Sequence, residues 1–357
     1  MKLYGRNWTR RDLEAHVGRI EQVGGVRRMK LTEGREKGVE QIQVRTGAGL
    51  EYYVSPMRGM DISLAQFGGV PISWQSGNGD VHPSYYDPEG GEWGRTAAGG
   101  LLMTCGLTQV GSPCEENGRK YGQHGRAHHT PATQVSAEAR WEKDEYSMTV
   151  RGTIEESRIF GESLRLTRTI GSRLGENRIS IRDVVENVGE ESTPHMILYH
   201  FNFGFPLMSE RTRIAFPERS VVPRDEGIPV EGYDAWDVPQ SGYRERVYYH
   251  EQANGAASSA NRRNEGKAEV VITNPSFPSF DSKGSVGVEV HLAWNTGALP
   301  RLVEWKMPGE QTYVLGVEPS NCHVEGRVAE RKRGTLVTLQ PGASAAYELE
   351  LEIKVKS

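Results

Sequence analysis

The chain has 357 residues, of which 36% are hydrophobic and 25% charged, and its net charge at pH 7 is −4. Positive and negative side chains are interspersed without a basic block or basic helix, so nucleic acid and anionic membranes are not expected partners. No stretch is long and apolar enough to span a membrane, and the first residues lack the apolar run of a signal peptide. The three cysteines (Cys105, Cys114 and Cys322) form a small, odd set, as in proteins of a reducing compartment. We therefore expect a soluble, cytoplasmic protein.

Only the N-terminal region is expected to contain a helix, a short one capped by Thr9 and stopped by Gly18. From Val26 onward, short alternating runs are separated by Gly, Asn, Asp and Pro, a pattern typical of β-strands. Residues 76–132 are irregular by contrast. A long irregular stretch within a compact domain is usually functional, so we expect this one to contribute to a site.

The second half of the chain has clearer strand signals. Alternating apolar residues predict strands near 146–150, 164–170, 179–185, 286–294 and 347–355. Many short strands without a βαβ rhythm favour an all-β antiparallel sandwich. No break in composition divides the chain, so we expect a single domain over residues 1–357, with residues 1–25 as an N-terminal extension. Residues 254–267 are expected to form an exposed loop.

The most informative predicted strand runs from Pro194 to Pro206. Its side chains alternate between two largely apolar faces, and one of these faces ends in His200 and Asn202. Such a strand is expected to be interior, where polar groups need partners or a cavity. The alternative to a functional His200 is a core histidine whose hydrogen bonds are satisfied.

Two further segments carry side chains suited to acid–base chemistry. His124 is flanked by glycines, which leave its imidazole accessible to a ligand. Glu318 ends an apolar run before Pro319, where partial burial would raise its pKa toward that of a useful base. Sugar mutarotation needs a base to remove the proton of the anomeric hydroxyl and an acid to protonate the ring oxygen. Two histidines and a glutamate meet these needs, and we expect no metal or other cofactor.

Taken in this order, His124-Gly125, the strand segment from His200 to Phe203, and Glu318-Pro319 resemble the site segments of galactose mutarotases, also called aldose 1-epimerases. The chain is most similar to a less characterised bacterial branch of that superfamily, described only as aldose 1-epimerase-like, through residues 57–62, 85–90 and 99–107. The resemblance extends over residues 18–352. It implies a large antiparallel β-supersandwich with its site in an open cleft, and an isomerase of carbohydrate metabolism that interconverts sugar anomers.

The same resemblance implies a role for each candidate residue. Glu318 would be the general base on the anomeric hydroxyl and His200 the general acid at the ring oxygen. His124 would bind a sugar hydroxyl or polarise the ring oxygen. Arg58 and Asn202 are expected to contact further hydroxyl groups, because hydroxyl recognition needs fixed donors and acceptors.

Three further residues are expected to contact the substrate, and each has a structural role as its alternative. Trp74 and Trp305 would stack on a sugar face unless they belong to the core. Arg126 stands where the classical enzymes have a second glycine, and its guanidinium would favour an acidic or modified sugar; an exposed structural arginine is the alternative. The substrate-binding aspartate of those enzymes has no clear counterpart, and Asp281 is a guess at its position.

Other interpretations remain open. Cys105, Cys114 and three nearby histidines lack a recognised zinc-ligand spacing, so no metal site is expected. Acidic residues within 76–132 would suit glycoside cleavage only if two of them were held at a defined separation. The sequence does not show their separation. A carbohydrate-binding or regulatory protein would keep the cleft without needing His200 and Glu318 near one sugar. An epimerase or lyase acting at another carbon would use the same acid and base. A small-molecule sugar is the expected partner, and a homo-oligomer is left open.

Overall fold

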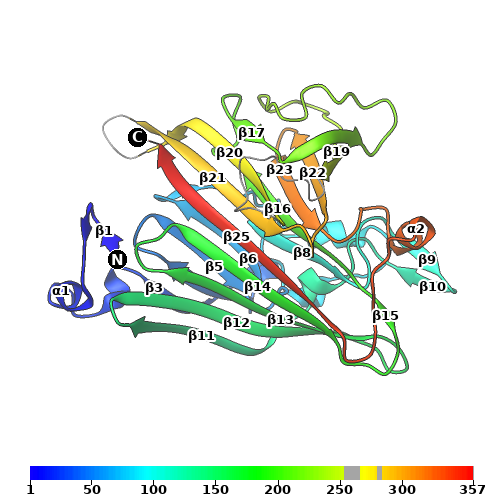
Figure 1. Cartoon of the computed structure of the whole chain (residues 1–357), viewed down its shortest axis with the longest axis horizontal. Helices are drawn as coiled ribbons and strands as arrows, with labels where there is room; N and C mark the ends of the chain where they lie inside the picture. Colours follow the sequence, from blue (N-terminus) through cyan, green and yellow to red (C-terminus); the bar gives the residue numbers. More distant parts are fainter. Residues whose placement is uncertain (253–265, 280–283, 357) are drawn as a thin grey trace.

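Two large antiparallel sheets face each other across this protein (Figure 1). The structure is a computed structural model that describes residues 1–252, 266–279 and 284–356. The order of strands in the first sheet is β11 (Thr133–Glu142), β12 (Glu145–Ser157), β13 (Ser163–Arg173), β14 (Arg178–Asn187), β25 (Ser344–Lys356), β21 (Ser285–Asn295), β20 (Lys267–Pro278) and β17 (Arg213–Ala215). The order in the second sheet is β18 (Glu218–Pro223), β19 (Arg246–Gln252), β22 (Arg301–Pro308), β23 (Tyr313–Ser320), β16 (Met196–Gly204), β8 (Leu102–Leu107), β6 (Asp61–Phe67), β5 (Leu50–Ser55), β4 (Glu40–Arg45) and β3 (Gly25–Lys30), with β7 (Val70–Pro71) beside β6.

Smaller elements complete the described chain, and the expected all-β antiparallel fold is confirmed. Two-stranded pairs are formed by β1 (Lys2–Leu3) with β2 (Arg6–Asn7), β9 (Cys114–Glu116) with β10 (Arg119–Tyr121), and β15 (Thr193–Pro194) with β24 (Thr338–Leu339). The α-helices are α1 (Arg10–Glu14) and α2 (Arg327–Arg333), and short 3-10 turns occur at Ile20–Gln22, Gly34–Glu36, Pro83–Tyr85, Glu92–Arg95 and Ala127–His129. Within the described ranges, no helix has the length and apolarity needed to cross a membrane.

The two α-helices differ in the capping signals that their sequences contain. Helix α1 follows Thr9, whose hydroxyl oxygen accepts a hydrogen bond from the backbone N–H of Asp12, so the predicted cap is confirmed. The expectation that only the N-terminal region is helical is wrong at α2. This helix starts after Gly326 without a side-chain cap and stops at Gly334, which has a φ of 73°. Its start therefore lacks the side-chain signal that marks α1.

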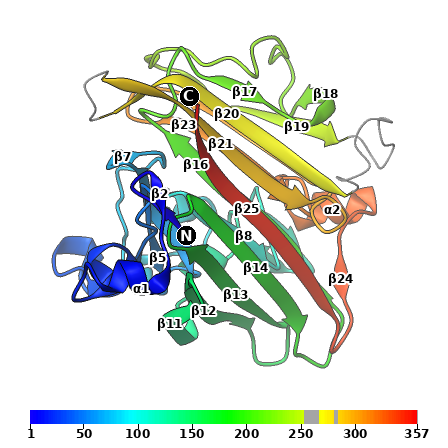
Figure 2. The same ribbon diagram turned by 60° about the vertical axis from the view of Figure 1, so that its left-hand side comes forward.

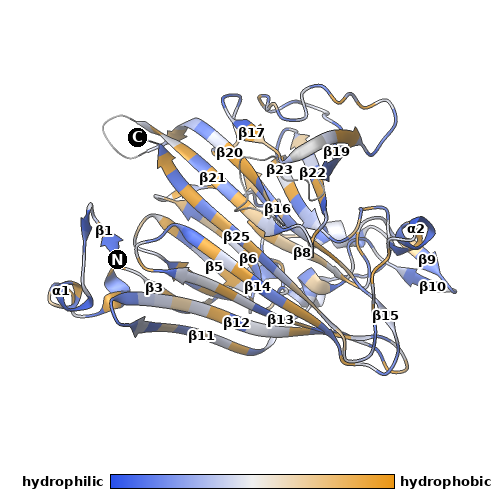
Figure 3. Ribbon diagram, viewed as in Figure 1, coloured by the Kyte–Doolittle hydropathy of each residue, from blue (hydrophilic) through white to orange (hydrophobic). Residues whose placement is uncertain are grey.

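The main core fills the space between the two sheets. Strand β25 turns Tyr347, Leu349, Leu351 and Ile353 inward and its charged side chains outward, as the alternation predicted. The same alternation appears along the strands of the first sheet in Figure 3. Figure 2 shows β16 and β8 lying behind β25 and β14, in the other layer of the sandwich.

Strand β16 is buried at every position, as expected of an interior strand. One face, represented by Tyr199 and Phe201, belongs to the main core. The other face, represented by Met196 and Leu198, belongs to a second apolar cluster that also contains Trp93, Met103 and Val303. The predicted division of the two faces is confirmed, and the second face is the one that carries His200.

A buried ionic network connects the two sheets. The guanidinium of Arg168 on β13 lies 2.7 Å from a carboxylate oxygen of Asp183 on β14 and 2.7 Å from one of Asp61 on β6. Asp61 also contacts Nδ1 of His128 at 2.7 Å, and Asp183 accepts a hydrogen bond from the hydroxyl of Tyr199 at 2.7 Å. Because Tyr199 directly precedes His200, this network fixes the strand that carries the candidate acid.

Candidate functional site

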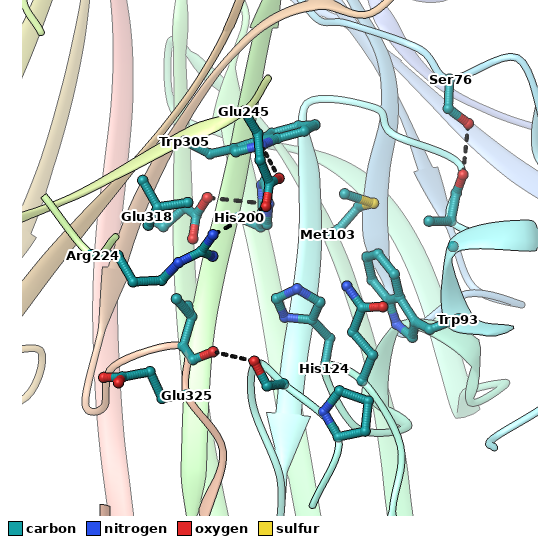
Figure 4. Close-up of a pocket in the computed structure, with 18 of the residues that line it drawn as sticks. Ser76, Trp93, Met103, His124, His200, Arg224, Glu245, Trp305, Glu318 and Glu325 are labelled. Carbon is teal, nitrogen blue, oxygen red and sulfur yellow. Dashed lines mark hydrogen bonds and ion pairs between the residues drawn. The ribbon is translucent and has the colours of Figure 1, made fainter. Parts of the chain in front are cut away.

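A cavity of about 650 Å³ lies on the face of the second sheet that points away from the first sheet (Figure 4). Strands β8, β16, β22 and β23 contribute its floor. Its walls come from the segments 74–97, 111–124, 224–247 and 324–325. The volume is within the usual range for small-molecule sites.

Strand register brings His200 and Glu318 together on this floor. Strands β16 and β23 are antiparallel, and the pairing of Phe201 with Val317 puts His200 opposite Glu318. On its other side, His200 is paired with Met103 of β8. The Nε2 atom of His200 lies 3.1 Å from Oε1 of Glu318. Both side chains are therefore within reach of one bound ligand.

Burial sets the protonation of this pair, because only 6% of His200 and 2% of Glu318 is exposed. Burial and the neighbouring His124 lower the pKa of His200 to about 3. Burial and the carboxylate of Glu245 raise the pKa of Glu318 well above its ordinary value, while the Arg224 guanidinium opposes that shift. Near neutral pH the imidazole of His200 is thus neutral, and burial favours the protonated form of the Glu318 carboxyl group, so one transferable proton can be shared by the two groups.

His124 reaches the cavity from a loop that is pinned to strand β8. Gly125 has a φ of 72°, and a Cβ atom there would lie 2.3 Å from the carbonyl oxygen of Gly106, so only glycine fits. The His124 ring lies 4.8 Å from the ring of Trp93 and 6.1 Å from that of His200, between centroids. Burial and Arg224 lower the pKa of His124 to about 4. Within the described residues its ring nitrogens have no hydrogen-bond partner, so a neutral imidazole is available to a ligand.

A charged wall faces His124 across the cavity, and Figure 4 shows it as Glu245 and Arg224 beside Trp305. The indole Nε1 of Trp305 donates a hydrogen bond to Glu245 at 2.8 Å. Arg224 donates to the same carboxylate at 3.2 Å and to Asp225 at 2.7 Å. The guanidinium is therefore already neutralised by two carboxylates. Trp305 in turn lies edge-on to His200, with ring centroids 5.5 Å apart.

Five of the eight side chains predicted for the site line this cavity: Trp74, His124, His200, Trp305 and Glu318. Arg58 does not line it, and the expectation that it contacts a sugar hydroxyl is corrected by its burial. Only 1% of Arg58 is exposed, and its guanidinium donates to the backbone carbonyls of Val81 and Thr96 and contacts His128. It ties the irregular segment to the second sheet.

Asn202 and Arg126 also lie outside the cavity lining. Asn202 is fully buried, and its amide donates to the backbone carbonyls of Gly100 and His200, so its role here is to fix the backbone beneath the site. Arg126 is exposed on the surface, which is the structural alternative stated above. Its guanidinium therefore gives no support for an acidic sugar. Asp281 and most of the predicted loop at 254–267 lie outside the described residues.

Arg224, Glu245, Trp93 and Met103 line the cavity without having been predicted. Trp93 lies in the irregular segment and could have been proposed as an aromatic contact. Arg224 and Glu245 bracket the connection between β18 and β19 and carry no motif. Across the described part of the chain, no group of three His, Cys, Asp or Glu side chains is arranged to hold a metal ion.

Gly316 makes room for the His200–Glu318 pair, and its replacement should disturb both groups. A Cβ atom at this position would lie 2.7 Å from Oε1 of Glu318, 2.9 Å from Cβ of Trp305 and 3.1 Å from Cε1 of His200. We expect Gly316→Ala to displace the pair and to cost roughly 1–3 kcal/mol of unfolding free energy, as measured by urea unfolding. Gly18→Ala is the matched control, because a Cβ there meets nothing within 4 Å. A free energy of unfolding in Gly316→Ala equal to that of the wild type would contradict this account of the floor.

Comparison with solved structures defines the class of this fold as a galactose mutarotase-like sandwich, as expected. A candidate aldose 1-epimerase from Klebsiella pneumoniae is similar over 94% of this chain and 86% of its own, with a TM-score of 0.79 and 25% identity. A galactose 1-epimerase from Lactobacillus acidophilus covers 93% of this chain and 99% of its own, with a TM-score of 0.58 and 12% identity. A galactose mutarotase-like protein from Clostridium acetobutylicum has the same TM-score and identity, with coverage of 94% and 100%. The two more distant likenesses concern the fold alone.

The family itself follows from a match over most of the sequence. Residues 36–353 match the domain of unknown function DUF4432, so the chain belongs to that family. No curated protein matches the chain. The family description assigns no activity.

Proposed function

We propose that this protein is a mutarotase-type sugar epimerase that interconverts the anomers of an aldose. The observation that carries the proposal is the 3.1 Å contact between His200 and Glu318 on a cavity floor, with the unpartnered imidazole of His124 beside them. General acid–base catalysis requires donor and acceptor within hydrogen-bond reach of the same substrate. The fold shared with a candidate aldose 1-epimerase supports the same reaction class.

The shared proton suggests how the reaction would run. Transfer of the proton from Glu318 to His200 across their 3.1 Å contact gives a carboxylate and an imidazolium. Glu318 then accepts the proton of the anomeric hydroxyl while His200 protonates the ring oxygen, and the bond from C1 to that oxygen breaks. After rotation of the open aldehyde, the ring closes on the other face. As it closes, Glu318 gives its proton to the aldehyde oxygen and His200 takes the proton of the ring oxygen. Return of the proton from His200 to Glu318 then restores the starting state without any cofactor.

Charge in the cavity favours a neutral sugar as the first candidate. Arg224, the cationic side chain of the wall, is paired with Asp225 and Glu245 and is not free to bind a substrate carboxylate or sulfonate. The carboxylates of Asp225 and Glu245 would also repel an anionic group of a substrate seated beside them. The remaining polar groups suit hydroxyl recognition.

The test is an anomer-exchange screen by NMR exchange spectroscopy or polarimetry, over neutral aldoses, amino and deoxy sugars, and uronic acids. We expect exchange above the spontaneous rate for at least one neutral aldose, and weaker effects for uronic acids. Saccharide binding without exchange would instead favour the carbohydrate-binding or regulatory alternative. Loss or inversion at a carbon other than C1, seen in the same spectra, would indicate an epimerase or lyase.

A further inference from the structure

The cavity is larger than one sugar ring requires. Its volume is about 650 Å³. A hexopyranose has twelve non-hydrogen atoms and displaces about six waters of roughly 30 Å³ each, so one ring would fill less than a third of this space. The His200–Glu318 pair occupies only the floor. The walls therefore offer room for groups beyond the reacting ring.

One wall is neutral, aromatic and only partly satisfied by hydrogen bonds, and we call it the Trp74 wall (Trp74, Ser76, Asn78, Trp93 and Ala97). Within the described residues, the indole N–H of Trp74 has no hydrogen-bond partner. The Asn78 amide donates to the backbone carbonyls of Gly94 and Ala97, and its own carbonyl oxygen has no partner in the described chain. Trp74 and Asn78 thus present an aromatic ring, a donor and an acceptor along the same cavity, which are the groups that bind sugar rings.

The Trp74 wall is continuous with the reaction floor. The Trp305 ring lies edge-on to both His200 and Trp74, with centroids 5.5 Å and 5.9 Å apart. Trp305 therefore lies next to both the reaction floor and the Trp74 wall. The charged wall offers no equivalent surface, because Arg224, Asp225 and Glu245 are engaged with one another.

Backbone hydrogen bonds hold the Trp74 wall in place without a ligand. The backbone N–H of Trp74 donates to the carbonyl of Asn202 at 3.1 Å, and Gly100 donates to the carbonyl of Trp74 at 2.7 Å. Ser76 is held by Ala98 through its backbone N–H at 3.0 Å. A preformed surface of this kind lowers the ordering cost of binding.

We infer that the preferred substrate is a reducing di- or oligosaccharide, with its reducing-end ring on the His200–Glu318 pair and the next ring on the Trp74 wall. The inference rests on the proposed function, because only the reducing end of such a chain carries a free anomeric hydroxyl. Ring opening and closure at that end leave the glycosidic bond intact. The second ring contributes binding and takes no part in the chemistry.

The test compares the monosaccharide that exchanges fastest with disaccharides that carry the same sugar at their reducing end, such as maltose and cellobiose when that sugar is glucose. We expect wild-type kcat/KM to be at least tenfold higher for one of the disaccharides. Trp74→Ala should reduce that value about tenfold and should reduce the monosaccharide value by a clearly smaller factor. Trp74→Phe, which keeps an aromatic face, should restore most of the disaccharide preference.

Each outcome has a distinct meaning. Equal kcat/KM for the two substrate sizes, or equal losses for both in Trp74→Ala, would overturn the inference and leave the proposed function standing. An absence of exchange with every mono- and disaccharide would overturn the proposed function itself, and the inference with it. Thermal unfolding of the variants shows whether an equal loss of kcat/KM for both substrates in Trp74→Ala is caused by unfolding. If it is, the disaccharide preference of Trp74→Phe decides whether the inference holds.

Discussion

Replacing Glu318 by Gln should lower the rate of anomer exchange about 10²- to 10⁴-fold, the usual contribution of a positioned acid–base group. Glutamine keeps the shape of the side chain but cannot accept the proton of an anomeric hydroxyl. It also removes the transferable proton that Glu318 shares with His200 across 3.1 Å. The measurement is exchange spectroscopy on the best aldose, with kcat and KM separated. We expect the loss mainly in kcat, because the proton moves only in the transition state.

A matched control separates chemistry from folding. Glu348→Gln makes the same chemical change on a side chain that is 69% exposed on β25, and it should leave both exchange and stability unchanged. Glu318→Gln should also remain folded, since it removes an ionisable group that burial already disfavours in its charged form. Exchange at the wild-type rate by a folded Glu318→Gln variant would exclude Glu318 as the base.

The largest stability effect is expected at Arg168. This side chain is 1% exposed and bridges Asp61 and Asp183 between the two sheets. Replacement by Leu would leave two buried carboxylates without their counter-charge, and removing one partner of a buried pair costs about 3–5 kcal/mol. Urea unfolding of Arg168→Leu should show a loss of this size. Exchange should fall as well, because Asp183 holds the Tyr199 hydroxyl next to His200.

Arg178→Leu supplies the comparison for this prediction. Arg178 pairs with Glu350 and Glu352, but its side chain is 41% exposed and the pairs are solvated. An exposed pair of this kind contributes at most about 1 kcal/mol. Equal destabilisation by the two substitutions would contradict the view that burial makes the Arg168 network important.

Local sequence signals singled out His124, His200 and Glu318 as candidates, and the resemblance to galactose mutarotases joined them into one site. His124 lies between Gly122 and Gly125, Glu318 precedes a proline, and His200 is a polar residue near the end of an otherwise apolar row of its strand. The antiparallel architecture was equally accessible, since β25 and β21 alternate regularly along their length. Strand β8 was missed because it lies within residues 76–132, which were expected to be irregular, and because burial at every position leaves no alternation to detect; β16 is also buried throughout, but its aromatic and branched residues indicated a strand.

Arg58 and Arg126 show where local reasoning fails. Both have residue types suited to sugar binding, yet one is locked in the interior by backbone carbonyls and the other faces solvent. Conversely, Glu245 reaches the site although its contact with Trp305 spans 60 residues of sequence. No local pattern encodes a contact of that kind, because packing between distant segments decides which polar groups meet.

The sequence by itself determined the all-β fold class and the three acid–base candidates, because alternation, glycine and proline act on the neighbouring backbone. Tertiary structure decided everything that depends on distance and burial. It placed His200 3.1 Å from Glu318, and through desolvation it lowered the pKa of His200 and raised that of Glu318. It also brought the rings of Trp305 and Trp74 into edge-on contact beside the reaction floor. Protonation and cavity shape are properties of the assembled environment, which only the packed sheets and loops define.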